Sequence, residues 1–447
     1  MRKSFFVGYT IFVLFCSNLQ AQKAFFESEK GNKENVMSSA YWEFWNDKAQ
    51  AEIDENIEKH RKTDVTIKLD QIPPGTNIQI EQISHSFLFG GNIFLFGDFK
   101  TPEQNEKYEN TFGTLFNAAT VPFYWKTLEP VQGKPRYEAG SSYEYRRPPI
   151  DPIVDFCESR GINMNGHAII YGMRRWGHPE WIPENRKKME KYFEAHIKEL
   201  AGRYRDKIQR WDVVNEPTDQ ANRGIMPDDY TYKSFIWAMK YFPSSVFLNI
   251  NDSDMHWEMT LYRRYLEIVR NLIDRGVRID QVGLQMHIFN PDESRRIAQG
   301  ADILTPEKIY ERLDYMSDAA RPIHVSEVTV SAPDETEKGE AIQAEITRNL
   351  YRLWFSYPTV MGITWWNIVD GGAAPGEPSL SGIYNKEMQP KIVYDTLDQL
   401  INHEWKTKLI IKTDKDGLLK FRGFRGKYRV DWKDKSGRKQ SLELNIE

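Results

Sequence analysis

The chain has 447 residues, with 60 Lys and Arg against 64 Asp and Glu and a formal net charge of −4. This length accommodates one large domain with a smaller module, or two to three average domains. The slightly acidic balance argues against nucleic acid or an acidic membrane surface as the main partner.

Residues 1–21 have the pattern of a secretory signal peptide. Met1-Arg2-Lys3 precedes an apolar run from Phe5 to Phe15, and Ala21 is a suitable cleavage position. The apolar run is too short to favour a membrane span. Cys16 raises the alternative of a surface lipoprotein, which the bulky Phe15 before it disfavours. We therefore expect a secreted protein, periplasmic or extracellular, and a monomer.

Cleavage would leave Cys157 as the only cysteine, which excludes an intrachain disulfide and a cysteine metal cluster. Residues 22–83 are expected to form a polar, poorly ordered stretch to about residue 39, a helix over 41–62 and a β hairpin. The hairpin strands are the alternating runs 65–69 and 78–80, with the turn at Pro73-Pro74-Gly75 between them.

From residue 84 to 404 buried strands alternate with amphipathic helices, which predicts an α/β protein with a (β/α)8 TIM barrel. Candidate strands are 87–91, 115–120, 164–170, 210–215, 246–250, 281–286, 323–327 and 362–367. Helices are expected at 187–204, 257–275, 306–318, 338–355 and 391–402. Residues 405–447 alternate again and predict a small antiparallel β module that packs with the N-terminal hairpin.

Two glutamates stand at the ends of predicted barrel strands. Glu216 follows strand four in the run Trp211-Asp212-Val213-Val214-Asn215-Glu216, and Glu327 ends strand seven. A lone strand-end Glu is usually only an exposed residue, but these two strands face each other across the barrel mouth. Carboxyl groups there could lie roughly 5–5.5 Å apart, the spacing of retaining glycosidases.

Further polar residues end other strands, and a packing explanation does not account for all of them together. His167 ends strand three, Gln285 and His287 end strand six, and Trp366 ends strand eight. We expect Asn215 to hydrogen-bond a sugar 2-hydroxyl, and we expect the Trp366 ring to lie beneath the reacting sugar ring as its floor. His287 is expected to hydrogen-bond Glu327 and keep it ionised.

Over residues 84–404 the chain resembles glycoside hydrolase family 10, the retaining β-1,4-xylanase family. The motif ending in Asn215-Glu216 resembles the family's acid/base motif, Gln285-Met286-His287 its strand-six motif, and Val325-Ser326-Glu327 its nucleophile strand. The resemblance implies that Glu216 is the general acid/base and Glu327 the nucleophile. It also implies that residues at the end of strand three and just after it, including Tyr171, contact the substrate. Asn251 in the strand-five motif is expected to contact the substrate as well.

The chain departs from the family pattern where a sugar would bind in the minus-two subsite. The usual Glu-Asn and Lys are replaced within Val121-Pro122-Phe123-Tyr124-Trp125, and Tyr171-Gly172 stands in place of Trp-His. The Asp that often follows the nucleophile motif is Thr329, and a second floor Trp is missing after Asp370. These changes predict altered substrate preference with conserved chemistry.

The sequence thus predicts a secreted endo-1,4-β-xylanase that acts on polysaccharide or oligosaccharide, with no cofactor and no metal. The same mechanism on a decorated xylan oligosaccharide or another β-glycoside stays open, and so does a non-catalytic carbohydrate-binding barrel. The Asn-Glu-Pro motif also keeps glycoside hydrolase families 5 and 39 open, although the Gln-x-His strand favours family 10.

Overall fold

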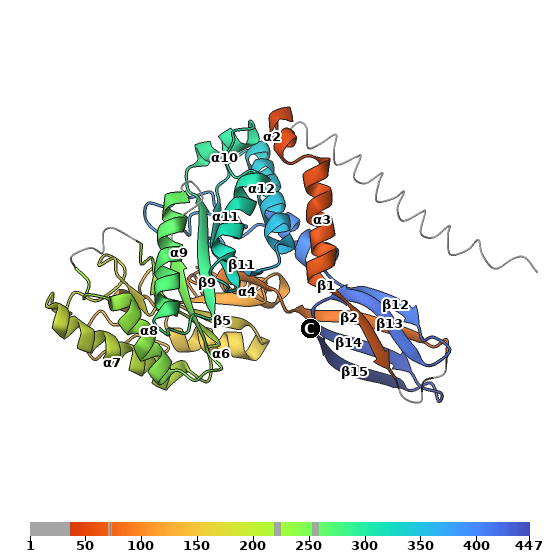
Figure 1. Cartoon of the computed structure of the whole chain (residues 1–447), viewed down its shortest axis with the longest axis horizontal. Helices are drawn as coiled ribbons and strands as arrows, with labels where there is room; N and C mark the ends of the chain where they lie inside the picture. Colours follow the sequence, from red (N-terminus) through yellow and green to blue (C-terminus); the bar gives the residue numbers. More distant parts are fainter. Residues whose placement is uncertain (1–35, 70–71, 73, 219–224, 253–258) are drawn as a thin grey trace, which may run out of the picture.

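A computed structural model describes residues 36–69, 72, 74–218, 225–252 and 259–447 (Figure 1). The predicted signal peptide and most of the polar stretch after it lie outside the described residues. Figure 1 shows a large α/β body with a separate β-sheet module beside it, and the C-terminus lies in that module.

The large body is the predicted barrel of eight parallel strands. Pairing of β5 with β7 and of β11 with β3 closes the sheet. Strands β9 and β10 are buried along their whole length, because helices cover the outer face of a parallel barrel. The strands are β3 (Leu88–Asn92), β4 (Ala118–Pro122), β5 (Asn163–His167), β7 (Arg210–Asn215), β8 (Phe247–Asp252), β9 (Gln281–Ile288), β10 (Ile323–Val330) and β11 (Val360–Trp365), with β6 (Ile170–Tyr171) added beside β7.

Helices follow the strands as predicted, and the predicted start of one of them, residues 257 and 258, lies outside the described residues. The closing helix changes to a π-helix, η2 (Gln399–Glu404), in its second half. The helices are α4 (Pro102–Thr114), α5 (Trp125–Leu128), α6 (Ile150–Arg160), α7 (Arg186–Tyr204), α8 (Tyr230–Tyr241), α9 (Met259–Asp274), α10 (Pro291–Ala298), α11 (Pro306–Ser317), α12 (Glu337–Ser356) and α13 (Ile392–Asp398). None of the described helices is long and apolar enough to cross a membrane.

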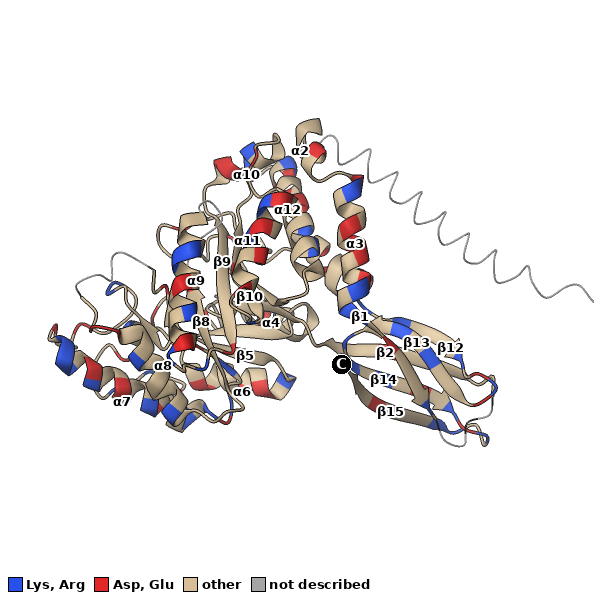
Figure 2. Ribbon diagram, viewed as in Figure 1, with Lys and Arg blue, Asp and Glu red and all other residues tan. Residues whose placement is uncertain are grey.

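The N-terminal helix predicted over 41–62 is two helices, α2 (Ser39–Phe44) and α3 (Asp47–Arg61). The break falls at Asn46, whose side chain accepts a hydrogen bond from the Ala49 N–H at 3.1 Å and caps α3. Helix α3 carries both acidic and basic residues (Figure 2). It packs on α12, where Gln50 Nε2 donates to Asn349 Oδ1 at 2.9 Å.

The predicted N-terminal hairpin is wrong, because its two strands pair with the tail and not with each other. Strand β1 (Lys62–Lys68) pairs with β13 (Leu418–Phe424), and β2 (Asn77–His85) lies between β12 (Lys408–Lys412) and β14 (Gly426–Lys433). Strand β15 (Lys439–Ile446) completes the four-stranded sheet. A separate apolar cluster that includes Ile78, Leu419 and Tyr428 holds the two sheets together, so the tail packs with the N-terminal segment as predicted.

Candidate active site

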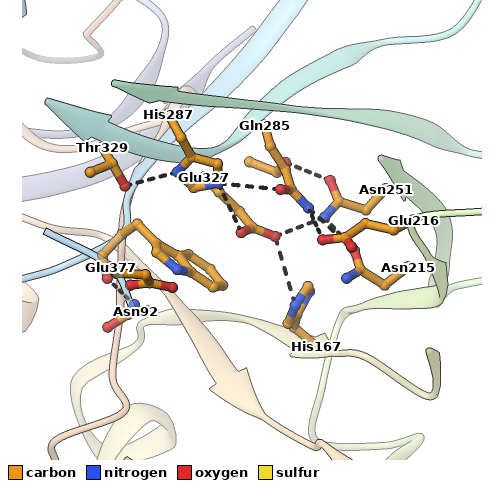
Figure 3. Close-up of polar contacts among 12 residues, drawn as sticks. Asn92, His167, Asn215, Glu216, Asn251, Gln285, His287, Glu327, Thr329 and Glu377 are labelled. Atoms are coloured by element: carbon orange, nitrogen blue, oxygen red, sulfur yellow. Dashed lines mark hydrogen bonds and ion pairs between the residues drawn. The ribbon is translucent and has the colours of Figure 1, made fainter. Parts of the chain in front are cut away.

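Glu216 lies directly after β7, at the mouth of the barrel. Its backbone adopts a left-handed conformation, with φ of 51°, and its N–H donates to the Asn251 carbonyl at 2.8 Å. Two side chains donate to its carboxyl group. The Tyr171 hydroxyl donates at 2.5 Å, and Gln285 Nε2 donates at 3.1 Å (Figure 3). The carboxyl group is therefore held in one orientation by donors from β6 and β9.

Glu327 lies within β10 and is only 4% exposed. Its Oε1 accepts a hydrogen bond from Asn251 Nδ2 at 2.9 Å and lies 3.7 Å from His167 Nε2. Its Oε2 lies 3.4 Å from His287 Nε2 (Figure 3). Residues from strands three, five and six of the barrel thus converge on this one carboxyl group.

Irregular strand pairing places the polar groups of β7 on the same side. In a regular strand Asp212 and Asn215 would point to opposite faces, since side chains alternate. The pairing of β7 with β8 shifts between Asp212 and Val214, and both Asp212 and Asn215 reach the site. A similar shift in the β9–β10 pairing lies between Val325 and Glu327.

Asp212 and His167 form the charged pair next to Glu327. His167 Nδ1 lies 2.8 Å from Asp212 Oδ2, which also accepts a hydrogen bond from Asn165 Nδ2 at 2.8 Å. Burial by itself would lower the pKa of His167, but the bond to Asp212 and the charge of Glu327 raise it above its usual value. His167 is therefore the cation that faces Glu327.

His287 lies beside Glu327, as expected from the sequence, and it does so as a neutral group. Burial lowers the pKa of His287 to about 4, so the imidazole is neutral at neutral pH. Its Nδ1 lies 2.8 Å from Thr329 Oγ1 and its Nε2 lies 3.2 Å from Gln285 Oε1. The Thr hydroxyl at this position brings no negative charge to hold the imidazole protonated.

Burial also raises the pKa of Glu327 to about 8, and the negative charges of Glu216 and Asp212 act in the same direction. The positive charge of His167 and the hydrogen bond from Asn251 oppose this rise. Ionisation of Glu327 therefore depends on the His167–Asp212 pair.

Asn251 is fully buried and uses its amide on protein groups. Its Nδ2 donates to Glu327 Oε1 and, at 2.8 Å, to Asn215 Oδ1, while its Oδ1 accepts from Ser326 Oγ at 2.5 Å. These contacts position the Glu327 carboxyl group, and the substrate contact expected for Asn251 stays a prediction. They also orient the Asn215 amide, because its Oδ1 is the acceptor.

Aromatic rings form the wall of the site, in a small cluster of Phe94, Tyr124, Tyr171 and Trp366. The Trp366 ring lies edge-on to His167, with centroids 5.5 Å apart. Tyr124, in the segment that lacks the usual minus-two residues, has its hydroxyl 3.1 Å from His167 Nε2. The Arg147 guanidinium lies 3.8 Å from the centre of the Tyr124 ring.

The structure thus brings together all of the predicted site residues, and it adds Asp212, Tyr124 and Ser326. Asp212 stands within the motif that ends in Glu216, so a signal existed, but strand alternation pointed it away. From the sequence alone, Tyr124 stands out only as part of the segment in which the usual polar residues of the minus-two subsite are replaced. Among the described residues no cluster of three or more His, Cys, Asp or Glu is arranged to hold a metal ion.

A (β/α)8 barrel with carboxyl groups from strands four and seven at its mouth is typical of glycoside hydrolases that use two carboxylates. Residues 88–400 match the sequence profile described as Glycosyl hydrolase family 10. The chain belongs to this family.

Curated relatives and solved structures are similar to the chain at low identity. The anti-sigma-I factor RsgI6 of Acetivibrio thermocellus is 26% identical over 416 residues, which are 90% of this chain and 48% of that protein. Endo-1,4-beta-xylanase A of a Caldicellulosiruptor species is 26% identical over 351 residues, 67% of this chain and 48% of that protein. The chain therefore spans about half the length of these two relatives. Native xylanase 10B from Thermotoga maritima has the same fold, with a TM-score of 0.58 and 19% identity over 71% of this chain and 96% of that one.

Proposed function

We propose that the protein is a retaining glycoside hydrolase that cleaves β-1,4-xylosidic bonds in xylan-type polysaccharide. The observation that carries the proposal is the chain of contacts that joins the two glutamates. Gln285 donates to Glu216 and contacts His287, which in turn contacts Glu327. Such a network orients one carboxyl group relative to the other, as a two-step displacement needs.

In the proposed mechanism Glu327 attacks the anomeric carbon and Glu216 protonates the departing oxygen. Glu216 then takes a proton from the water that releases the sugar from Glu327. His167 stabilises the ionised form of Glu327, and Tyr171 and Gln285 hold Glu216. The Asn215 amide, oriented by Asn251, is placed to donate from Nδ2 to a substrate hydroxyl.

Azide rescue distinguishes the two carboxyl roles. On dinitrophenyl β-xylobioside, whose leaving group needs no proton, Glu216→Ala should still form the glycosyl intermediate and, with azide, give a β-glycosyl azide. Glu327→Ala should lose activity by about 10⁴-fold or more and, with azide, give the α-anomer. Glu311→Ala, a change at an exposed helix residue, serves as the control. Wild-type activity within a few-fold in Glu327→Ala would end the proposal.

Substrate preference is tested with plain xylan, glucuronoarabinoxylan and xylo-oligosaccharides. Tyr124 and Arg147 occupy the wall where the usual minus-two residues are missing, so we expect weaker action on plain xylan than on a decorated or short substrate. If the preferred substrate is a different β-glycoside, the enzyme should turn over an aryl glycoside of another sugar. The similarity to a protein named as an anti-sigma factor keeps a binding role as the second candidate, recognised by sugar binding without turnover.

The predicted secretion is part of the proposal and is tested by expressing residues 1–447 and sequencing the N-terminus of the mature protein. A start at Gln22 would support cleavage after Ala21. A lipid on Cys16 would support the surface-anchored alternative. A chain that keeps Met1 would contradict secretion by this route. The predicted monomeric state is tested by light scattering.

A further inference from the structure

A cavity lies at the opposite end of the barrel from the two glutamates. It has a volume of about 540 Å³ and lies where strands β3, β10 and β11 begin, so Phe87, Arg321 and Val360 line it. The end of α3 and the link between β13 and β14 complete its wall with Arg61 and Arg425. The barrel, the N-terminal helix α3 and the β module thus all contribute to this cavity, and we call it the junction cavity.

The charged groups of this junction cavity are all basic. Arg61, Arg321 and Arg425 line it, and no Asp or Glu is among its described lining residues. Their guanidinium groups donate to backbone carbonyls: Arg61 to Val360 at 2.8 Å, Arg321 to Ile279 at 2.6 Å and Arg425 to His60 at 2.7 Å. Within the described part of the chain these contacts hold the three groups in place without a carboxylate partner.

The carbonyl contacts compensate only part of the charge. Arg61 also donates to the carbonyls of Phe355 and Tyr357 at the end of α12, where the helix dipole supplies about half a negative charge. Burial and the neighbouring Arg425 lower the pKa of Arg61 to about 9, as expected for a cation that lacks a full counter-charge. Three fixed guanidinium groups around a cavity form a site for an oxyanion.

The size and the apolar walls of the cavity indicate more than a bare inorganic ion. Phe87, Phe355 and Phe424 line it beside the arginines. A cavity of this volume falls within the ~300–1,000 Å³ of small-molecule sites. The three rings are buried, and Arg61 lies over two of them, so they hold the guanidinium group at the cavity wall. We propose that the junction cavity binds the carboxylate of a uronic acid, as carried by an acidic oligosaccharide. The choice of a sugar acid rests on the proposed function, whereas the anion site does not.

The test uses the full chain with Glu327→Gln, so that no probe is turned over, and isothermal titration calorimetry. The probes are an aldotriouronic acid, neutral xylotriose and sodium phosphate. We expect the aldotriouronic acid to bind in the junction cavity, in addition to any binding at the barrel mouth. Arg321→Gln and Arg425→Gln should each weaken this second binding at least ~10-fold, whereas Arg321→Lys should keep more of it because the charge stays. Arg438→Gln, on an exposed turn of the module, is the matched control.

Three outcomes would overturn the proposal: a single binding event that the arginine changes leave unaffected, equal second-site binding of xylotriose, or binding of phosphate with no binding of the sugar acid. Circular dichroism and thermal unfolding of each variant show whether weakened binding reflects misfolding. Hydrolysis by the wild-type chain is measured separately, so a failure of the proposed function is distinguished from a failure of the cavity assignment.

Discussion

At the scale of single residues, the chemistry of the site depends on which histidine carries a charge. His167 keeps its proton through Asp212. Among the described residues the polar partners of His287, besides Glu327, are the neutral groups Thr329 and Gln285. The two imidazoles approach opposite oxygens of the same carboxylate and differ in protonation because only one has an acidic partner behind it.

Asp212→Asn should therefore move the acidic limb of the pH profile of kcat/KM to higher pH. Without the Asp212 carboxylate burial dominates the pKa of His167, and the cation beside Glu327 is lost. The charge of His167 affects the pKa of Glu327 more than the charge of Asp212 does, so the pKa of Glu327 rises further. We expect a loss of about 10- to 100-fold at pH 6 that becomes smaller as the pH rises. Thr329→Val is the control, because His287 is already neutral. An unchanged limb in Asp212→Asn would contradict the assignment.

Glu327→Gln should stabilise the protein at slightly alkaline pH. The pKa of Glu327 is raised to about 8 in the folded chain, against a usual value near 4.5, so the folded state holds the proton over a range in which the unfolded state has lost it. The free energy of unfolding of the wild type therefore falls as the pH rises from about 4.5 to 8. We expect the Gln variant to be more stable by about 1–3 kcal/mol at pH 8 and to show little difference at pH 4.5.

Thermal unfolding of both proteins across this pH range measures the difference, with Glu311→Gln as the exposed control. A difference in stability between the two proteins that stays constant with pH, or that increases toward acidic pH, would show that the buried carboxyl group does not titrate as described.

At the scale of elements, the helix α3 carries Arg61 to the junction cavity and begins at a side-chain cap. Asn46→Ala removes the acceptor of the Ala49 N–H and should lower the free energy of unfolding by about 1 kcal/mol. Chemical denaturation measures the change. Asn46→Asp keeps an acceptor and should be close to the wild type, so equal losses in the two variants would argue against the cap.

At the scale of the whole molecule, the two ends of the chain share one β module. Removal of residues 405–447 would strip β1 and β2 of their partners β12, β13 and β14 and expose the apolar cluster between the sheets. We expect aggregation or the loss of a cooperative unfolding transition, because unpaired strands associate between molecules. Removal of residues 434–447 takes only the edge strand β15 and should be milder. Size-exclusion chromatography with thermal unfolding compares the two, and a soluble, cooperative 1–404 chain would refute this dependence.

The sequence by itself determined the barrel and the gathering of Glu216, Glu327 and their polar neighbours at its mouth. Strand and helix periodicities differ, and all strands of a (β/α)8 barrel bring their carboxyl ends to one face, so local pattern is sufficient for both results. The Asn46 cap that separates α2 from α3 is a local signal as well.

Only the tertiary structure decided the remaining features. The pairing of β1 with β13 joins residues 350 to 362 positions apart, and no local signal distinguishes it from a hairpin. The side on which Asp212 lies depends on a register shift between β7 and β8. The charges of His167, His287 and Arg61 depend on burial and on which distant groups surround them, because desolvation and partner distance set a pKa and neither is written in neighbouring residues.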